Sequence, residues 1–199
     1  MSRKPKEPPD TSSLRQATAT FTKQTDRGSA LVAAAWVDDA LDAYLRAFFR
    51  PDKKLVDEIL QSEGALGTFS SRIKITYLLG LIDSNSHNDL EIIRGIRNDF
   101  AHVRQQIRFT DQSIKDRCKR LHAAKAFQLG TGTTMRSPRE MFLISAYFLG
   151  EYLLSLAENT KPPRMMEIDY GVPIRRFAKS MTLREIMLAL ESLENRSGG

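Results

Sequence analysis

The chain has 199 residues, enough for one domain with its own hydrophobic core and short for two. Its 41% hydrophobic and 27% charged residues are typical of a soluble globular protein. The net charge of +6 permits a polyanionic partner, whereas the single cysteine, Cys118, excludes an internal disulfide and any metal site with several cysteines. Residues 141–157 are apolar but interrupted by Glu151, and residues 1–10 lack the apolar core of a signal peptide. We therefore expect a cytoplasmic protein that does not enter a membrane.

The first part of the chain predicts a tail followed by three helices. Residues 1–10 are basic and rich in proline, and we expect a disordered tail there. A helix is expected from residue 12 or 13 to residue 24, ended by a break at residues 26–28. The strongest helical pattern covers residues 29–48, and its small alanines favour close packing against another helix. A short helix is expected at residues 51–60.

The middle of the chain predicts three more helices. Thr68 is the expected N-cap of the first, and residues 83–86 are expected to form a turn before the second. The three helices are expected at 69–82, at 87–106 with Leu90, Ile93, Ile96 and Phe100 facing inward, and from 111 or 113 to 125. Residues 129–136 predict a flexible loop.

The last part begins with a near-complete helix start, Ser137-Pro138-Arg139-Glu140, in which a serine cap is followed by proline and glutamate. This helix is expected to reach residue 158, and residues 182–195 predict a final amphipathic helix. No strand pattern of useful length is present. We therefore predict an all-α bundle of about six to eight helices. The predicted parts are a tail at 1–10, the bundle at 11–160 and a C-terminal extension at 161–199.

Three polar residues near the end of the predicted 87–106 helix carry the clearest chemistry. Arg97 can supply a fixed charge to a phosphate, His102 can exchange a proton near neutral pH, and Asn98 can orient either one. On an ideal helix, Asn98 and His102 share a face. A base that takes the 2′-OH proton and a cation that stabilises the charged phosphorane are sufficient for metal-free RNA cleavage. Arg97, Asn98 and His102 are thus candidate catalytic residues.

A structural interpretation stands beside this one. A histidine at a helix C-terminus often only caps the helix. Arg97 can likewise form a structural ion pair with an acid of the 29–48 helix. The candidate supporting acids are Asp38 and Asp39, with Asp42 as a third choice.

Basic residues gather between positions 94 and 120, where eight basic residues stand against three acidic ones. The stretch is either a solvated, ion-paired helix face or a surface for nucleic acid. The candidate nucleic-acid-binding residues are Arg94, Arg104, Arg108, Lys115, Arg117, Lys119 and Arg120.

Two further patterns are weaker. Cys118 and His122 are four residues apart, but two ligands do not make a metal site, and we expect no metal or cofactor. The loop at residues 130–134 lacks the lysine and the preceding strand of a phosphate-binding P-loop.

Three ordered blocks resemble the mannitol operon repressor family: TDRGSALVAAAWVDDAL (25–41), LGTFSSRIKITYLLGLI (66–82) and DLEIIRGIRNDFAH (89–102). The resemblance covers roughly residues 20–158. It implies an all-helical domain, usually a dimer, that represses transcription without a recognisable DNA-binding motif. The segment IRNDFAH also resembles the HEPN superfamily, whose motif is an arginine, a polar residue, a few spacer residues and a histidine. The resemblance implies a metal-independent ribonuclease in which a dimer brings two such motifs together. Arg97, Asn98 and His102 match that motif.

Two functions follow from these patterns. The first is a helical homodimer that regulates transcription through a protein or nucleic-acid partner or through its basic surface. The alternative is a metal-independent ribonuclease of the HEPN type, a toxin or defence element, in which Arg97 and His102 act on RNA.

Overall fold

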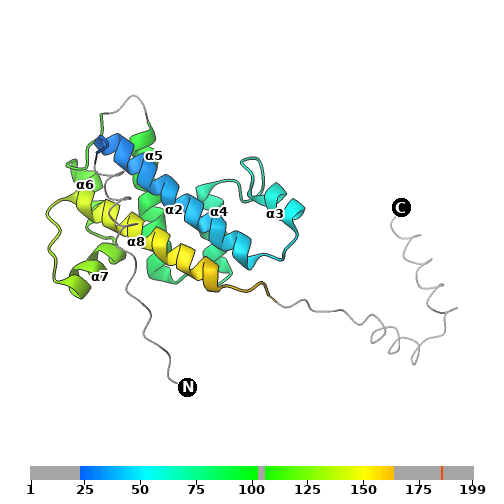
Figure 1. Ribbon diagram of the computed structural model, residues 1–199. Coiled ribbons are helices and arrows are strands. Elements are labelled where there is room, and N and C mark those ends of the chain that lie inside the picture. The colour runs from blue at the N-terminus through cyan, green and yellow to red at the C-terminus, as the bar shows by residue number, and fades with distance from the viewer. Residues whose placement is uncertain (1–22, 103–105, 164–184, 186–199) are drawn as a thin grey trace, which may run out of the picture. The chain divides into compact units, whose positions relative to one another are not determined.

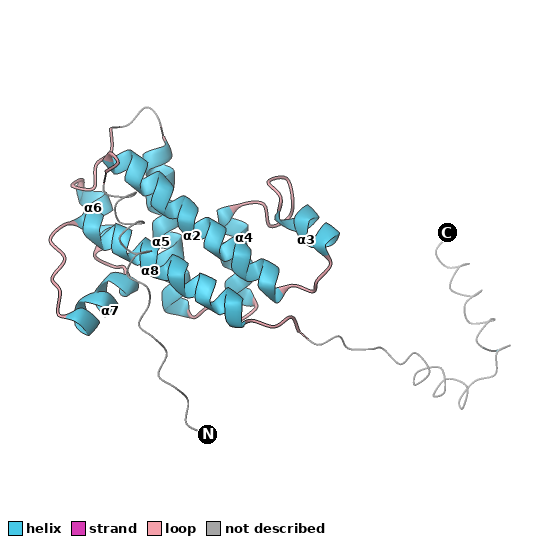
Figure 2. Cartoon of the chain, in the orientation of Figure 1, coloured by secondary structure: helices cyan, strands magenta, loops and turns pink. Residues whose placement is uncertain are grey.

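The computed structural model describes residues 23–102, 106–163 and Glu185. Every regular element in this part is a helix (Figure 2). The elements are α2 (Asp26–Phe48), α3 (Lys53–Leu60), α4 (Phe69–Leu78), α5 (Ser84–Ala101), α6 (Gln112–Cys118), α7 (His122–Thr131) and α8 (Pro138–Asn159). The predicted all-α class is confirmed. The predicted tail at 1–10, and the predicted helices at 12–24 and 182–195, lie almost wholly outside the described residues.

Contacts divide the chain into two units after Pro163, and the seven described helices belong to the first. The two longest of them, α2 and α8, lie side by side and run in the same direction (Figure 1). The side of α2 that packs inward is built largely from small residues, among them Ala30, Ala33 and Ala34, and these are buried. The predicted close packing of this helix is therefore confirmed.

The contact between α2 and α8 is tight near Trp36 and Gly150. A Cβ atom placed on Gly150 would lie 2.2 Å from Nε1 of Trp36, so the indole occupies the space that any larger residue would need. Trp36 Nε1 is itself buried without a hydrogen-bond partner. Glycine at position 150 thus allows the helices to approach each other at this point.

The starts of α2 and α8 are fastened together by Arg139. Its guanidinium lies 3.3 Å from Asp26 Oδ1 and donates to the carbonyl of Gln24 and to Ser29 Oγ, each at 2.6 Å. The predicted start of α8 is confirmed, since Ser137 and Glu140 form a capping box there. This tether sets the register of the two helices.

The predicted break at residues 26–28 is wrong, because these residues form the first turn of α2. Thr25 is the N-cap, and its hydroxyl accepts a hydrogen bond from the Gly28 N–H at 3.1 Å. Asp26 stays in the first turn, where its charge suits the helix dipole and reaches Arg139.

Helix α5 crosses behind α2 and packs on α4, α6, α7 and α8 as well (Figure 1). The predicted inward row of Leu90, Ile93, Ile96 and Phe100 is confirmed, because all four are buried. The Phe100 ring lies 4.9 Å from the Phe109 ring, which lies 5.3 Å from the Phe142 ring of α8. These rings fix the C-terminal end of α5 against the core.

Three predicted boundaries change. Helix α4 stops at Leu78, before Gly80 takes up a φ of 69° that favours glycine. The predicted turn at 83–86 is mostly helix, because Asp83 caps α5 by accepting from the Ser86 N–H at 2.7 Å. The helix expected from about 111 to 125 is two helices, since the backbone leaves the helical region at Leu121 (ψ 121°). That side chain is fully buried.

Helix α8 is long and apolar enough to cross a membrane, judged by length and composition alone within the described residues. It packs within the bundle against α2, α5, α6 and α7. Eight of its residues are buried in these contacts, including Phe142, Ala146 and Leu153. Packing in the core accounts for its apolar composition.

Candidate functional site

The end of α5 carries the three candidate catalytic residues. Arg97 is exposed, and its Nη1 donates to Asn98 Oδ1 at 3.1 Å. His102 is also exposed and is the C-cap of the helix, where its main-chain N–H donates to the Asp99 carbonyl at 3.2 Å. The structure therefore joins Arg97 and Asn98 and places His102 one residue beyond the helix.

The expected common face of Asn98 and His102 stays a prediction. The helix ends at Ala101, and His102 keeps a helical φ of -67°, whereas its ψ of 111° turns the chain that follows it away from the helix. Within the described residues, the His102 side chain makes no hydrogen bond to Arg97 or Asn98. A catalytic role for the three residues remains a prediction.

The alternative in which Arg97 pairs with an acid of α2 is not formed among the described residues. Asp38 Oδ1 lies 2.7 Å from Nη1 of Arg72, which comes from α4 and also donates to the Leu60 carbonyl at 2.9 Å. The Arg72 side chain is only 13% exposed. Burial raises the pKa of the Asp38 carboxyl above its ordinary value, against the opposing effect of Arg72. Asp38 therefore supports the contact between α2 and α4, and it does not support Arg97.

The other two acids of α2 do not reach Arg97 either. Asp42 pairs with Arg46 at 2.5 Å and lies 3.6 Å from Arg72 Nε. Asp39 is exposed to solvent. With these acids engaged elsewhere or exposed, Arg97 is left as a solvent-facing cation at the end of α5.

Several of the predicted nucleic-acid-binding residues are held in ion pairs. These pairs are Arg94 with Glu91 at 2.7 Å, Arg117 with Asp99, and Lys119 with Asp116 at 4.0 Å. Such pairs match the structural interpretation of this stretch, because a paired cation is less available to a phosphate.

The remaining members of that set that the structure describes differ in exposure. Arg108 and Arg120 are exposed, and Lys115 is partly buried in α6. Arg104 lies outside the described residues. The role of the whole set in binding nucleic acid remains a prediction.

Sequence reasoning missed a buried acid, Asp89 on α5. Its side chain is 2% exposed and accepts hydrogen bonds from the main-chain N–H groups of His122 and Ala123, both at 2.8 Å. Its Oδ1 also lies 3.1 Å from Nδ1 of the His122 ring. Leu121, the N-cap of α7, has no side-chain acceptor to offer, so the carboxylate of Asp89 caps this helix from α5.

One signal in the sequence does point to Asp89. It lies four residues before Ile93 and seven before Ile96, so it belongs to the same buried row of α5 as those two. A charged residue in a buried row needs partners. The sequence gives no sign of which residues supply them.

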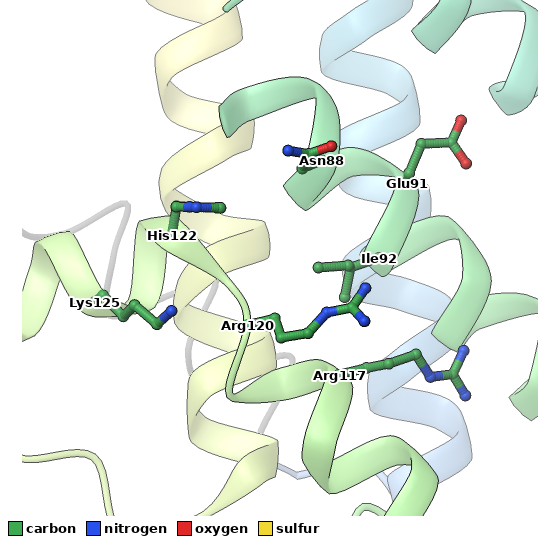
Figure 3. A pocket seen from close by; sticks show the side chains of 7 residues that line it. All are labelled: Asn88, Glu91, Ile92, Arg117, Arg120, His122 and Lys125. Carbon is green, nitrogen blue, oxygen red and sulfur yellow. The ribbon is translucent and has the colours of Figure 1, made fainter. Parts of the chain in front are cut away.

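A cleft of about 530 Å³ opens beside this contact (Figure 3). Helix α5 supplies one wall, with Asn88, Glu91 and Ile92. The segment from the end of α6 into α7 supplies the facing wall, with Arg117, Arg120, His122 and Lys125. Three cations and a histidine thus face one carboxylate, so the cleft is electropositive.

The Cys118–His122 pair does not form a metal site. The Cys118 side chain is fully buried in the core, and burial raises the pKa of its thiol to about 12. His122 is turned to Asp89 instead. Within the described part of the chain, no group of three or more His, Cys, Asp or Glu residues is placed to hold a metal ion.

A family model described as "Mannitol repressor" matches residues 21–157. The mannitol operon repressors of Escherichia coli K12 and of Escherichia coli O6:H1 are each 29% identical over 107 residues, which cover 52% of this chain and 55% of each relative. The chain thus spans about half the length of the curated relatives it matches.

Two solved structures share the fold. One is the MtlR–HPr complex from Escherichia coli, with a TM-score of 0.58 and 21% identity over 70% of this chain and 97% of that one. The other is a possible transcriptional regulator, YggD from Shigella flexneri 2a, with a TM-score of 0.52 and 12% identity over 73% of this chain and 96% of that one. At such identities the likeness concerns the fold alone.

Proposed function

Because this chain belongs to the mannitol repressor family, we propose that it is a transcriptional regulator that acts by binding a protein partner. The observation that carries the proposal is the family match over residues 21–157, which includes every described helix except the last residues of α8. A partner-based mechanism is supported by the MtlR–HPr complex, in which a protein with the same fold is bound to another protein.

The surface of α7 supports a partner over direct reading of DNA. Helices α6 and α7 are joined by residues 119–121, a short connection like that of a helix-turn-helix. A recognition helix needs polar side chains that reach base edges. Helix α7 exposes two polar side chains in its first part, His122 and Lys125, and then Ala126, Leu129 and Gly130 over its middle and end. The exposed apolar side chain of Leu129 suits contact with a protein better than contact with bases.

A homodimer is part of the proposal. Three consecutive large apolar residues at the end of α4 are exposed: Tyr77 by 41%, Leu78 by 79% and Leu79 by 42%. Contiguous exposed apolar surface is typical of an interface between chains. Light scattering at micromolar concentration should give twice the chain mass of 22.5 kDa. A species of only 22.5 kDa would contradict the dimer.

The regulatory function is tested with a reporter gene driven by the promoter of a mannitol operon in the organism that encodes this chain. Deletion of the gene for this chain should raise reporter expression, and complementation should restore repression. Calorimetric titration of the purified protein with HPr from the same organism should give a saturable complex. Unchanged expression together with no binding of HPr would contradict the proposal.

Metal-independent cleavage of RNA is the second candidate function. One observation favours it: Arg97 and His102 are both exposed at the same end of α5, and the His102 ring has no hydrogen-bond partner among the described residues. Labelled RNA incubated with the protein in EDTA should then yield products with 2′,3′-cyclic phosphate ends. His102→Ala should abolish cleavage, whereas His87→Ala, which changes a histidine stacked on Tyr77, should not. Intact RNA with the unaltered protein would exclude this activity.

A further inference from the structure

We propose that the cleft between α5 and the α6–α7 segment binds a small phosphate monoester that carries hydroxyl groups. This ligand site is separate from the protein-binding role proposed above and does not depend on it. The site is the 530 Å³ cleft of Figure 3, whose two walls differ in chemistry. Its volume falls within the range of about 300–1,000 Å³ that is usual for small-molecule sites.

Two cations in the cleft are available to an anion. Arg120 and Lys125 are exposed, and neither has an ion-pair partner within the described residues. Arg117 lies beside them but shares its charge with Asp99. Because both side chains line the cleft, a phosphate there has a guanidinium available as a two-pronged donor and an ammonium available as a point charge.

His122 adds a third group whose orientation is fixed. With its Nδ1–H donated to the buried carboxylate of Asp89, the imidazole leaves Nε2 for the cleft. Asp89 is therefore a positioning residue, since it holds the ring and the first turn of α7 without lining the cleft itself. A ring held in this way loses little conformational entropy when a ligand binds.

The wall from α5 fits the rest of the ligand. Both hydrogen bonds from Arg94 fall on Oε2 of Glu91, at 3.0 and 2.7 Å, so Oε1 stays available to accept from a hydroxyl. Asn88 offers an amide that can both donate and accept. A carboxylate and an amide opposite the cations favour a hydroxylated ligand over a bare anion such as inorganic phosphate.

The arrangement favours a small ligand over a nucleic acid. A polynucleotide backbone is bound by cations that continue along a groove. Arg117, which lines the cleft, and Arg94 and Lys119, which lie close to its lining residues in the sequence, pair with acids. Within the cleft this leaves Arg120 and Lys125 as available cations, and two cations suit one phosphate group better than a polynucleotide backbone.

The site is tested first by NMR on the full chain, with glucose 6-phosphate as the probe. The sequence contains three histidines, His87, His102 and His122, so their imidazole signals report on three separate places. His87→Gln and His102→Gln variants assign their signals, and the third belongs to His122. Addition of the probe should shift the His122 signal in a saturable manner and leave the other two in place. A shift of His102 without His122, or no shift at all, would overturn the proposal.

Affinity measurements with matched variants complete the test. The double variant Arg120→Gln/Lys125→Gln should weaken binding of glucose 6-phosphate by about tenfold or more. The control, Arg50→Gln/Lys54→Gln, removes two exposed cations around the start of α3 and should leave affinity unchanged. Glucose should not bind, and inorganic phosphate should bind more weakly than the monoester. The proposal would be overturned if both double variants lost affinity for glucose 6-phosphate equally. It would also be overturned if single-stranded RNA bound at the same residues more tightly than glucose 6-phosphate.

Discussion

Asp89 of α5 and His122 of α7 are joined across 33 positions of sequence by a buried carboxylate that accepts from both the ring and the main chain of the histidine. The contact does two things at once. It caps a helix whose own N-cap residue, Leu121, has no side chain able to do so. It also orients His122 at the edge of the electropositive cleft. One buried acid thereby links the stability of the bundle to the shape of the candidate ligand site.

The first prediction concerns this carboxylate. Asp89→Ala leaves two main-chain N–H groups and the His122 ring without their acceptor, so the free energy of unfolding should fall by about 3 kcal/mol. Asp89→Asn keeps one acceptor oxygen, so the free energy of unfolding should fall by roughly half as much. The control is Asp83, the exposed N-cap of α5, where Asp83→Ala should lower the free energy of unfolding by about 1 kcal/mol. Urea unfolding monitored by circular dichroism measures all three, and equal losses at Asp89 and Asp83 would contradict the prediction.

The second prediction concerns the contact between α2 and α8. Gly150→Ala places a methyl group 2.2 Å from Trp36 Nε1, and the free energy of unfolding should fall by about 1–3 kcal/mol because the two helices must separate. Gly130→Ala in α7 is the matched control, since nothing lies within 4 Å of its added methyl group. That change should be neutral or stabilising by roughly 0.5–1 kcal/mol, because alanine favours a helix over glycine. The melting temperature should therefore fall in Gly150→Ala and stay unchanged or rise in Gly130→Ala.

The third prediction compares two arginines. Arg72→Ala removes a largely buried guanidinium that holds Asp38 and the Leu60 carbonyl, so it should lower the free energy of unfolding by about 3 kcal/mol or more. Arg97→Ala removes an exposed side chain that is hydrogen-bonded to Asn98, and it should change the free energy of unfolding by less than about 0.5 kcal/mol. Chemical denaturation of both variants measures the two changes in the free energy of unfolding. A large loss at Arg97 would mean that this residue has a structural role after all.

The fourth prediction concerns the thiol of Cys118. Burial raises its pKa to about 12, so the thiol stays protonated and should not react with a thiol reagent at pH 8 until the protein unfolds. The folded pKa lies above the unfolded value of 9.0, so stability is fully present below pH 9.0 and should fall as the pH rises toward about 12. A Cys118→Ala variant should show a smaller decline over this range. Rapid labelling of the native protein would contradict the prediction.

Local signals in the sequence were sufficient for most helices and for the family. The capping box at Ser137 and Glu140, the small residues of α2 and the buried row of α5 all depend on residues three or four positions apart. The three blocks that resemble mannitol operon repressors lie within the residues 21–157 that the family model matches. Errors of boundary arose at local caps, as at Asp83, and also where a distant contact adds to a cap, as at residues 26–28, whose turn is capped by Thr25 and held by Arg139 from the start of α8.

The charged side chains are where the sequence alone was insufficient. By itself it determined the all-α class, which follows from short-range periodicity, and the family, which follows from the three blocks that resemble mannitol operon repressors. Only the tertiary structure decided that Asp38 pairs with Arg72, 34 positions away, and that Asp89 reaches His122. An ion pair or a cap forms wherever packing brings opposite partners within about 3–4 Å, whatever their separation along the chain. Packing of α5 against α6 and α7 created the cleft, and no pattern within any one of these helices contains it.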